Sequence, residues 1–233
     1  MSKQKNILRI GGSSGIGGAL TKILASQHQV YVASRNPEQL SGIAYTPIVL
    51  DARQQSISLD QLPASLDGFV YCPGSINLRP FKSLKEETFQ DDFNINVLGA
   101  IRNLQTIAPL LQAAENASVV FFSTVAVQTG MPFHASVAAA KGALEGLTRS
   151  LAAEWAPKIR VNAIAPSLVN TPLAEKFLNN ETKVAKVNER HPMKRSGTAE
   201  ELAKAAAYLL SDDSQWMSGT ILQLDGGIGN LKI

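Results

Sequence analysis

The sequence contains one cysteine, three histidines and no apolar stretch near the roughly 20 residues that a membrane-spanning helix needs. A single cysteine excludes an intrachain disulfide and fits a reducing compartment. The histidines lie far apart and no Cys/His cluster has metal-ligand spacing, so we expect no metal. The charged N-terminal segment lacks the apolar stretch of a signal peptide. We therefore expect a cytoplasmic protein with no membrane segment.

The chain also lacks a concentration of charge of either sign. Its net charge of +3 is spread over 233 residues, and no basic run is interleaved with aromatic residues. Nucleic acid is therefore not an expected partner. Apolar residues make up 45% and charged residues 18%, the balance of a globular domain. No linker or internal repeat divides the chain, so residues 1–233 are predicted to form a single domain.

Strand-like and helix-like segments alternate along the chain. Short apolar runs predict seven strands, at 6–10, 29–33, 45–50, 68–72, 118–122, 159–164 and 220–224. Helical patterns fall between them, at 15–27, 86–114, 136–155 and 198–210. This alternation predicts an α/β fold: a doubly wound, parallel, seven-stranded sheet of the Rossmann type. The polar segment 167–197 is long for a simple connection and is predicted to be a substrate loop or lid.

A glycine-rich turn follows the first predicted strand. Residues 11–17 read GGSSGIG and lead into a predicted helix. Gly11 permits a tight turn, Gly15 and Gly17 let a ligand approach the backbone, and the two serines offer hydroxyl donors. A strand, a glycine turn and a helix start in this order direct backbone N–H groups and the positive helix end at a pyrophosphate. The segment therefore predicts a dinucleotide site.

The end of the second predicted strand indicates which dinucleotide binds. An NAD site usually carries a carboxylate here for the ribose 2′-hydroxyl, whereas this chain has Ser34 and Arg35. A hydroxyl and a guanidinium suit a 2′-phosphate, so we predict NADP. The alternative for Arg35 is an ordinary solvated surface residue. Asp51, which ends the third strand, is predicted to meet the adenine amino group or else to cap the following turn.

With these features in place, the chain resembles the short-chain dehydrogenase/reductase family over nearly its whole length. The matching segments are 11–17 (GGSSGIG), 93–99 (FNINVLG), 118–124 (SVVFFST), 159–173 (IRVNAIAPSLVNTPL) and 219–227 (GTILQLDGG). The resemblance implies that the long helices 92–114 and 136–155 form the interface of a homotetramer. It also implies cofactor contacts from Gly11, Ser13, Ser14, Gly15, Ile16, Gly17, Ser34, Arg35, Asp51, Ala52, Pro73, Gly74, Lys141, Pro166, Val169 and Thr171.

The resemblance also implies catalytic roles. Lys141 matches the lysine that holds the nicotinamide ribose, Asn96 the asparagine of the proton relay, and Thr124 the serine that positions the substrate oxygen. The family's proton-donating tyrosine precedes the lysine by four residues, and here that residue is Val137. The family's Pro-Gly after the sixth strand is Pro-Ser here, at 166–167. The cofactor half of an oxidoreductase is kept and the main general acid is missing.

His134 is the predicted substitute for that acid. It lies three residues before Val137 and seven before Lys141, so a helix would place all three on one face. A histidine there can act as a general acid near neutral pH. The alternative is a residue at the helix start that bonds to the backbone. Ser136 is expected to be the helix N-cap rather than a catalytic group.

The sequence thus predicts an NADP(H)-dependent oxidoreductase with an altered proton relay, acting on a small carbonyl or activated C=C substrate. A catalytically inactive NADP-binding sensor or pseudoenzyme is the main alternative. A non-redox enzyme that uses the same pocket is a third.

Overall fold

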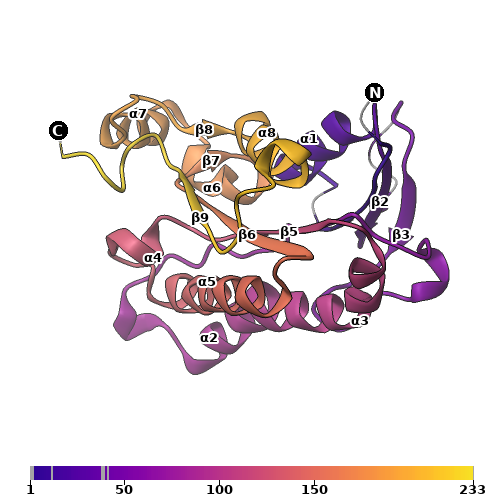
Figure 1. Ribbon diagram of the computed structural model, residues 1–233. Helices are drawn as coiled ribbons and strands as arrows, with labels where there is room; N and C mark the ends of the chain where they lie inside the picture. Colours follow the sequence, from indigo (N-terminus) through magenta and orange to yellow (C-terminus); the bar gives the residue numbers. More distant parts are fainter. Residues whose placement is uncertain (1–2, 12, 38–39, 41, 233) are drawn as a thin grey trace.

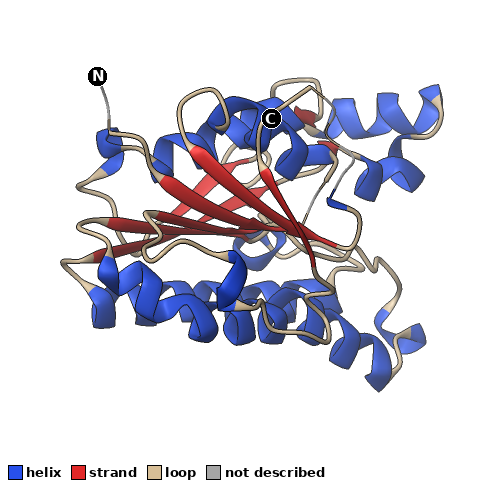
Figure 2. Ribbon diagram, turned by 90° about the vertical axis from the view of Figure 1, so that its right-hand side faces the viewer, coloured by secondary structure: helices blue, strands red, loops and turns tan. Residues whose placement is uncertain are grey.

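The computed structural model describes residues 3–11, 13–37, 40 and 42–232. A seven-stranded sheet, with helices on both faces, forms the centre of the molecule (Figures 1 and 2). The strand order is β3-β2-β1-β4-β5-β6-β9, and every pair is parallel. The strands are β1 (Asn6–Ile10), β2 (Gln29–Ser34), β3 (Thr46–Val49), β4 (Gly68–Tyr71), β5 (Ala117–Phe122), β6 (Ile159–Pro166) and β9 (Ile221–Leu224). All seven strands predicted from the sequence are confirmed.

Burial on both faces explains why the central strands read as continuous apolar runs. Every residue of β4 and β5 is buried, as a parallel sheet between two helical layers requires. Two apolar clusters form, one on each face. Leu104 and Leu144 belong to the first, and Leu20 and Leu209 to the second. The sheet is therefore a rigid base whose carboxyl edge is available for a ligand.

Four long helices cover the sheet. Helices α1 (Gly15–Leu24) and α8 (Ala199–Leu210) lie on one face, and α3 (Gly99–Ala113) and α5 (Ala135–Trp155) on the other (Figure 1). The predicted helix 86–114 is divided: α2 (Glu86–Phe93) passes through a π-helical turn, η4 (Asn94–Leu98), into α3. Within the described ranges no helix has the length and apolar character needed to cross a bilayer.

The segment predicted to be a lid has its own secondary structure. It contains β7 (Val169–Asn170), a 3₁₀ turn (Pro172–Ala174), α6 (Glu175–Leu178) and α7 (Glu181–Arg190). Strand β8 (Gly197–Thr198) closes it by pairing in parallel with β7. Both ends of the segment are therefore held together beside the main sheet. Other short helices in the described ranges include α4 (Ala126–Thr129) and the 3₁₀ turns Leu59–Gln61, Phe81–Ser83 and Asp212–Ser214.

Candidate active site

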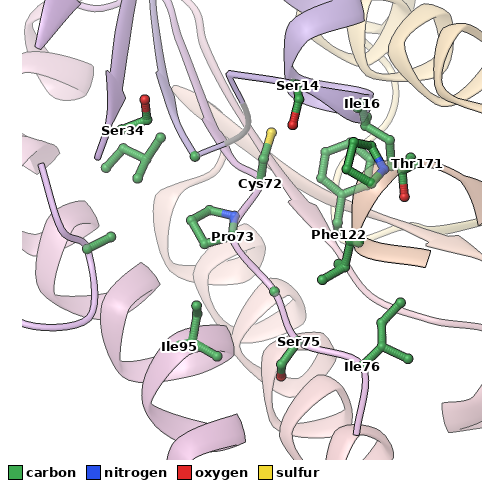
Figure 3. A pocket seen from close by; sticks show the side chains of 18 of the residues that line it. Ser14, Ile16, Ser34, Cys72, Pro73, Ser75, Ile76, Ile95, Phe122 and Thr171 are labelled. Carbon is green, nitrogen blue, oxygen red and sulfur yellow. The ribbon is translucent and has the colours of Figure 1, made fainter. Parts of the chain in front are cut away.

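A cavity of about 440 Å³ opens at the carboxyl edge of the sheet, where the strand order reverses between β1 and β4. Ligands of doubly wound folds bind at this reversal point. Every residue predicted to contact a cofactor lines this cavity. In Figure 3, Ser34 and Thr171 lie at opposite sides, with Cys72 and Pro73 between them. Residues distant in the sequence thus form one elongated site.

The glycine turn has the geometry of a phosphate cradle. Gly11 has φ of +81°, and a Cβ atom there would lie 2.5 Å from Pro73 Cγ. Gly15, with φ of +55°, faces Thr171 across the cavity, where an added Cβ would lie 3.3 Å from that side chain. Ser14 is the N-cap of α1, and its side chain makes no capping hydrogen bond. The turn and the helix start therefore present backbone to a ligand. Gly12 lies outside the described residues.

The predicted adenosine end of the cavity carries the two residues that suggested NADP. Ser34 is buried, and its Oγ has no hydrogen-bond partner within the described part of the chain. Arg35 is exposed and lines the cavity next to it. Asp51 also lines the cavity, but its Oδ1 accepts a hydrogen bond from the Arg53 backbone N–H at 3.1 Å. Its capping role is thus observed. The orphaned Ser34 hydroxyl and the glycine cradle fit a dinucleotide.

The opposite end of the cavity is organised around Lys141. Its side chain lines the cavity, is 6% exposed and donates from Nζ to the Phe122 carbonyl oxygen at 2.6 Å. Burial lowers the pKa of this lysine to about 8, partly opposed by the negative potential of Cys72 and Asp92. The side chain is therefore mainly protonated at neutral pH and loses its proton at mildly alkaline pH. Thr124 and Val137 line the same end of the cavity.

Asn96 lies directly behind this wall. It is fully buried, and its Nδ2 donates to Ser75 Oγ at 2.9 Å and to the Asp92 carbonyl oxygen at 2.7 Å. A Cβ atom on Gly74 would lie 3.3 Å from Asn96 Oδ1 and 3.5 Å from Lys141 Nζ. Asn96 Oδ1 has no partner among the described residues. The amide oxygen and the lysine therefore face one point at the cavity wall, beside Gly74.

A buried carboxylate organises this wall, and sequence reasoning missed it. Asp92 accepts hydrogen bonds from Ser75 and Asn77 on Oδ1 and from Ser136 on Oδ2. Asp92 lies one helical turn before Asn96, but nothing in the local sequence shows that its side chain points inward. The prediction that Ser136 caps α5 is wrong: the helix starts at Ala135, and Ser136 is buried against Asp92.

The structure does not bring His134 to the cavity. His134 is the N-cap residue of α5, and its Nδ1 makes a 2.8 Å hydrogen bond with the Pro132 carbonyl oxygen. Its ring is absent from the cavity lining, whereas Val137 and Lys141 on the same helix are present. Because the helix starts one residue after His134, the backbone there has φ of −99° and leaves the helical path. His134 therefore matches the alternative prediction, a residue at the helix start that bonds to the backbone.

No tyrosine lines this cavity, although all four tyrosines of the chain lie within the described residues. Cys72 does line it, but burial raises the pKa of its thiol to about 11, partly opposed by Arg9 and Lys141. The thiol is therefore protonated near neutral pH and is not an activated nucleophile.

Comparison with known proteins identifies the family. The family model described as enoyl-(acyl carrier protein) reductase matches residues 57–229. A tropinone reductase homolog of Arabidopsis thaliana is 33% identical over 241 residues, covering 96% of this chain and 91% of the relative. The chain belongs to the short-chain dehydrogenase/reductase family.

Two further relatives show the range of this family. The 2,5-dichloro-2,5-cyclohexadiene-1,4-diol dehydrogenase of Sphingobium indicum is 32% identical over 240 residues, covering 96% of both chains. The gluconate 5-dehydrogenase of Burkholderia cenocepacia, in complex with NADP and tartrate, superposes with a TM-score of 0.89 at 25% identity. That match covers 99% of this chain and 97% of the other. The relatives are oxidoreductases, which include reductases and dehydrogenases.

Proposed function

We propose that this protein is an NADP(H)-dependent oxidoreductase that acts on a small carbonyl or activated C=C compound. One observation carries the proposal: a single cavity joins the phosphate cradle, the Ser34–Arg35 pair and the Lys141–Thr124 pair. A cofactor bound along it would supply hydride to a substrate at the Lys141 end. The NADP complex of the gluconate 5-dehydrogenase supports the choice of cofactor.

In this proposal, different residues bind the cofactor and position the substrate. Backbone N–H groups of the turn and of the α1 start hold the pyrophosphate, and Ser34 and Arg35 hold the 2′-phosphate. Lys141 holds the nicotinamide ribose, with its ammonium fixed by the Phe122 carbonyl. The half-buried Thr124 hydroxyl orients the substrate oxygen. Orientation of this kind supplies much of the rate of a hydride transfer.

The proton relay is altered because Val137 cannot donate a proton. Val137 is 5% exposed and contributes an apolar patch where the family has a phenol. Loss of a general acid typically costs about 10²–10⁴-fold in rate. Reduction of an activated C=C bond tolerates this loss better than ketone reduction, because the developing charge is delocalised. We therefore favour enone-type substrates.

The test is a binding and turnover comparison. NADPH and NADH are titrated calorimetrically, and NADPH oxidation is then followed with a panel of ketones and enones. The proposal expects tighter NADPH binding and enone turnover that Lys141→Met abolishes. NADPH binding without oxidation by any compound would refute the oxidoreductase.

The second candidate is a dinucleotide-binding protein without turnover, and the apolar Val137 wall favours it. Such a sensor would keep the cradle and Lys141 but would not need Thr124. Thr124→Val separates the two, because it removes the hydroxyl at nearly constant volume. Reduced turnover at constant NADPH affinity supports the enzyme.

We also propose a homotetramer built on the helical face of α3 and α5. Phe93 and Leu98, at the start of that face, are exposed apolar residues of the kind that interfaces cover. Light scattering should give about four times the chain mass of 24.9 kDa, and a value of one chain mass would refute the assembly. A cytoplasmic location stays a prediction from the single cysteine, and the lid role of 167–197 stays a prediction from its length.

A further inference from the structure

Ser167 lines the cavity at the end of β6. It directly follows Pro166 and lines both the main cavity and a neighbouring one of about 200 Å³. The backbone of Val125 donates to the Pro166 carbonyl oxygen at 2.9 Å, so the chain at Thr124 runs beside the chain at Ser167. Ser167 and Thr124, the residue proposed to orient the substrate, therefore line the same cavity from neighbouring chain segments.

An imidazole stands behind this hydroxyl. His191 is 3% exposed, and its Nε2 lies 2.7 Å from Ser167 Oγ. Its Nδ1 lies 2.7 Å from the Val187 carbonyl oxygen. A carbonyl can only accept, so Nδ1 carries the hydrogen, and Nε2 of the neutral ring accepts from Ser167. A hydroxyl, a base and a third group that orients the base form the arrangement that activates a serine for proton transfer.

The elements around His191 hold the ring in place. His191 directly follows α7 in the chain. Its ring packs against Gly226, where an added Cβ would lie 3.4 Å from His191 Cδ2. The nearest charged groups on these elements have other partners. Asp225, on the turn after β9, accepts from the backbones of Gly227 and Gly229. Across the smaller cavity, Arg195 pairs with Glu201. Glu189, Arg190 and Lys194 flank His191 in the chain and are exposed.

We propose that Ser167 and His191 form the proton relay that replaces the missing tyrosine, with Ser167 as the group that contacts the substrate oxygen. This inference rests on the proposed oxidoreductase function. The relay would explain two departures from the family pattern together. Val137 stands where the family has a proton donor, and Ser167 adds a hydroxyl-bearing residue to the lining of the same cavity. The histidine predicted for the task was His134, whereas the structure directs His191 at the cavity through Ser167.

The proton balance of the relay is complete. In reduction, hydride from NADPH forms the new C–H bond, and the substrate oxygen takes the proton of Ser167 Oγ. Ser167 regains a proton from Nε2 of the His191 imidazolium, which becomes neutral and is recharged from solvent. In oxidation each step runs backwards, and neutral His191 accepts the alcohol proton through Ser167. Histidine suits both directions because a ring nitrogen can accept a proton in the neutral form and donate it in the charged form.

Three variants test the relay. Ser167→Gly restores the family's residue and removes the hydroxyl, and His191→Gln removes the base but keeps a hydrogen-bonding side chain. His28→Gln, far from the cavity, is the matched control. Turnover is measured from pH 5 to 9 with NADPH and the best compound of the panel, in H₂O and D₂O, together with NADPH affinity. The ¹⁵N shifts of His191 are recorded with and without NADP⁺.

The relay predicts a loss of about 10²-fold or more in turnover for Ser167→Gly and His191→Gln. NADPH affinity should change less than about threefold in both variants. NADP⁺ should shift the His191 ¹⁵N signals in the wild type but not in Ser167→Gly. Full turnover in either variant would overturn the relay alone. An inactive wild type that binds NADPH would instead refute the proposed function.

Discussion

The ammonium group of Lys141 donates a hydrogen bond to the carbonyl oxygen of Phe122 at 2.6 Å, although the side chain is almost completely buried. Phe122 is the last residue of β5, so the charge is fixed at the carboxyl edge of the sheet. Burial opposes the charged form and holds the pKa of Lys141 at about 8, against an ordinary value of 10.5. The lysine therefore links stability to pH.

The first prediction concerns that linkage. Below pH 8, Lys141 is protonated in both the folded and the unfolded chain; between pH 8 and 10.5 only the unfolded chain keeps the proton. Raising the pH through this window therefore stabilises the folded protein. Relative to Lys141→Met, the unfolding free energy of the wild type should rise by about 3 kcal/mol over the window. Denaturant unfolding at several pH values measures it, and parallel curves for the two proteins would contradict it.

The second prediction concerns cofactor choice. Arg35→Ala should weaken NADPH binding by about 1–3 kcal/mol, the range for a hydrogen bond to a charged group, and leave NADH binding nearly unchanged. Lys158→Ala is the control, because it removes an exposed positive charge away from the cavity. Isothermal titration with both nucleotides gives the comparison. Equal losses for NADPH and NADH would show that Arg35 does not recognise the 2′-phosphate.

The third prediction isolates the close contact at the glycine turn. Gly11→Ala and Gly130→Ala both place a Cβ at positive φ, which costs about 1–2 kcal/mol. Only the Gly11 variant also meets Pro73, at 2.5 Å, whereas nothing lies within 4 Å at Gly130. Gly11→Ala should therefore be less stable than Gly130→Ala by about 1–3 kcal/mol and should lose nucleotide binding. Thermal unfolding of the pair, with and without NADPH, provides the measurement.

The fourth prediction concerns a variant that carries the family's proton donor. Val137→Tyr should raise NADPH-dependent ketone reduction by about 10²–10⁴-fold, since the phenol would stand on the cavity wall one helical turn before Lys141. Val137→Phe supplies the same ring without the hydroxyl. Equal rates for the two variants would mean that ring volume, not proton donation, sets the activity.

The sheet could be predicted from the sequence because its strands are short, fully buried apolar runs separated by helical patterns. The position of the cavity could be predicted because its lining includes residues that leave local signs in the sequence. Gly11 and Ser34 are informative for this reason. Each stands out by its residue type and by its place after a strand, and Gly11 has the positive φ that a tight turn requires.

The rest of the site could not be predicted, since it depends on contacts between distant segments. Asp92 meets Ser136 from 44 residues away, and His191 meets Ser167 from 24 residues away. Helical periodicity placed His134 beside Lys141, but a helix that starts at Ala135 does not continue that periodicity backwards. The π-helical turn around Asn96 left no sign in the apolar pattern of 86–114.

The parallel pair of β7 and β8 has a consequence for how this protein can diversify. Val169 pairs with Gly197 and Asn170 with Thr198, so the chain leaves the main body and returns to it at a single point. An insert whose ends are already joined can change in length or sequence without disturbing the strands beneath it. Residues 175–186, which lie inside this insert and do not line the main cavity, can thus be exchanged between homologous enzymes while Thr171 and His191 stay in place. We propose such chimaeras as the test of whether the insert sets the substrate range.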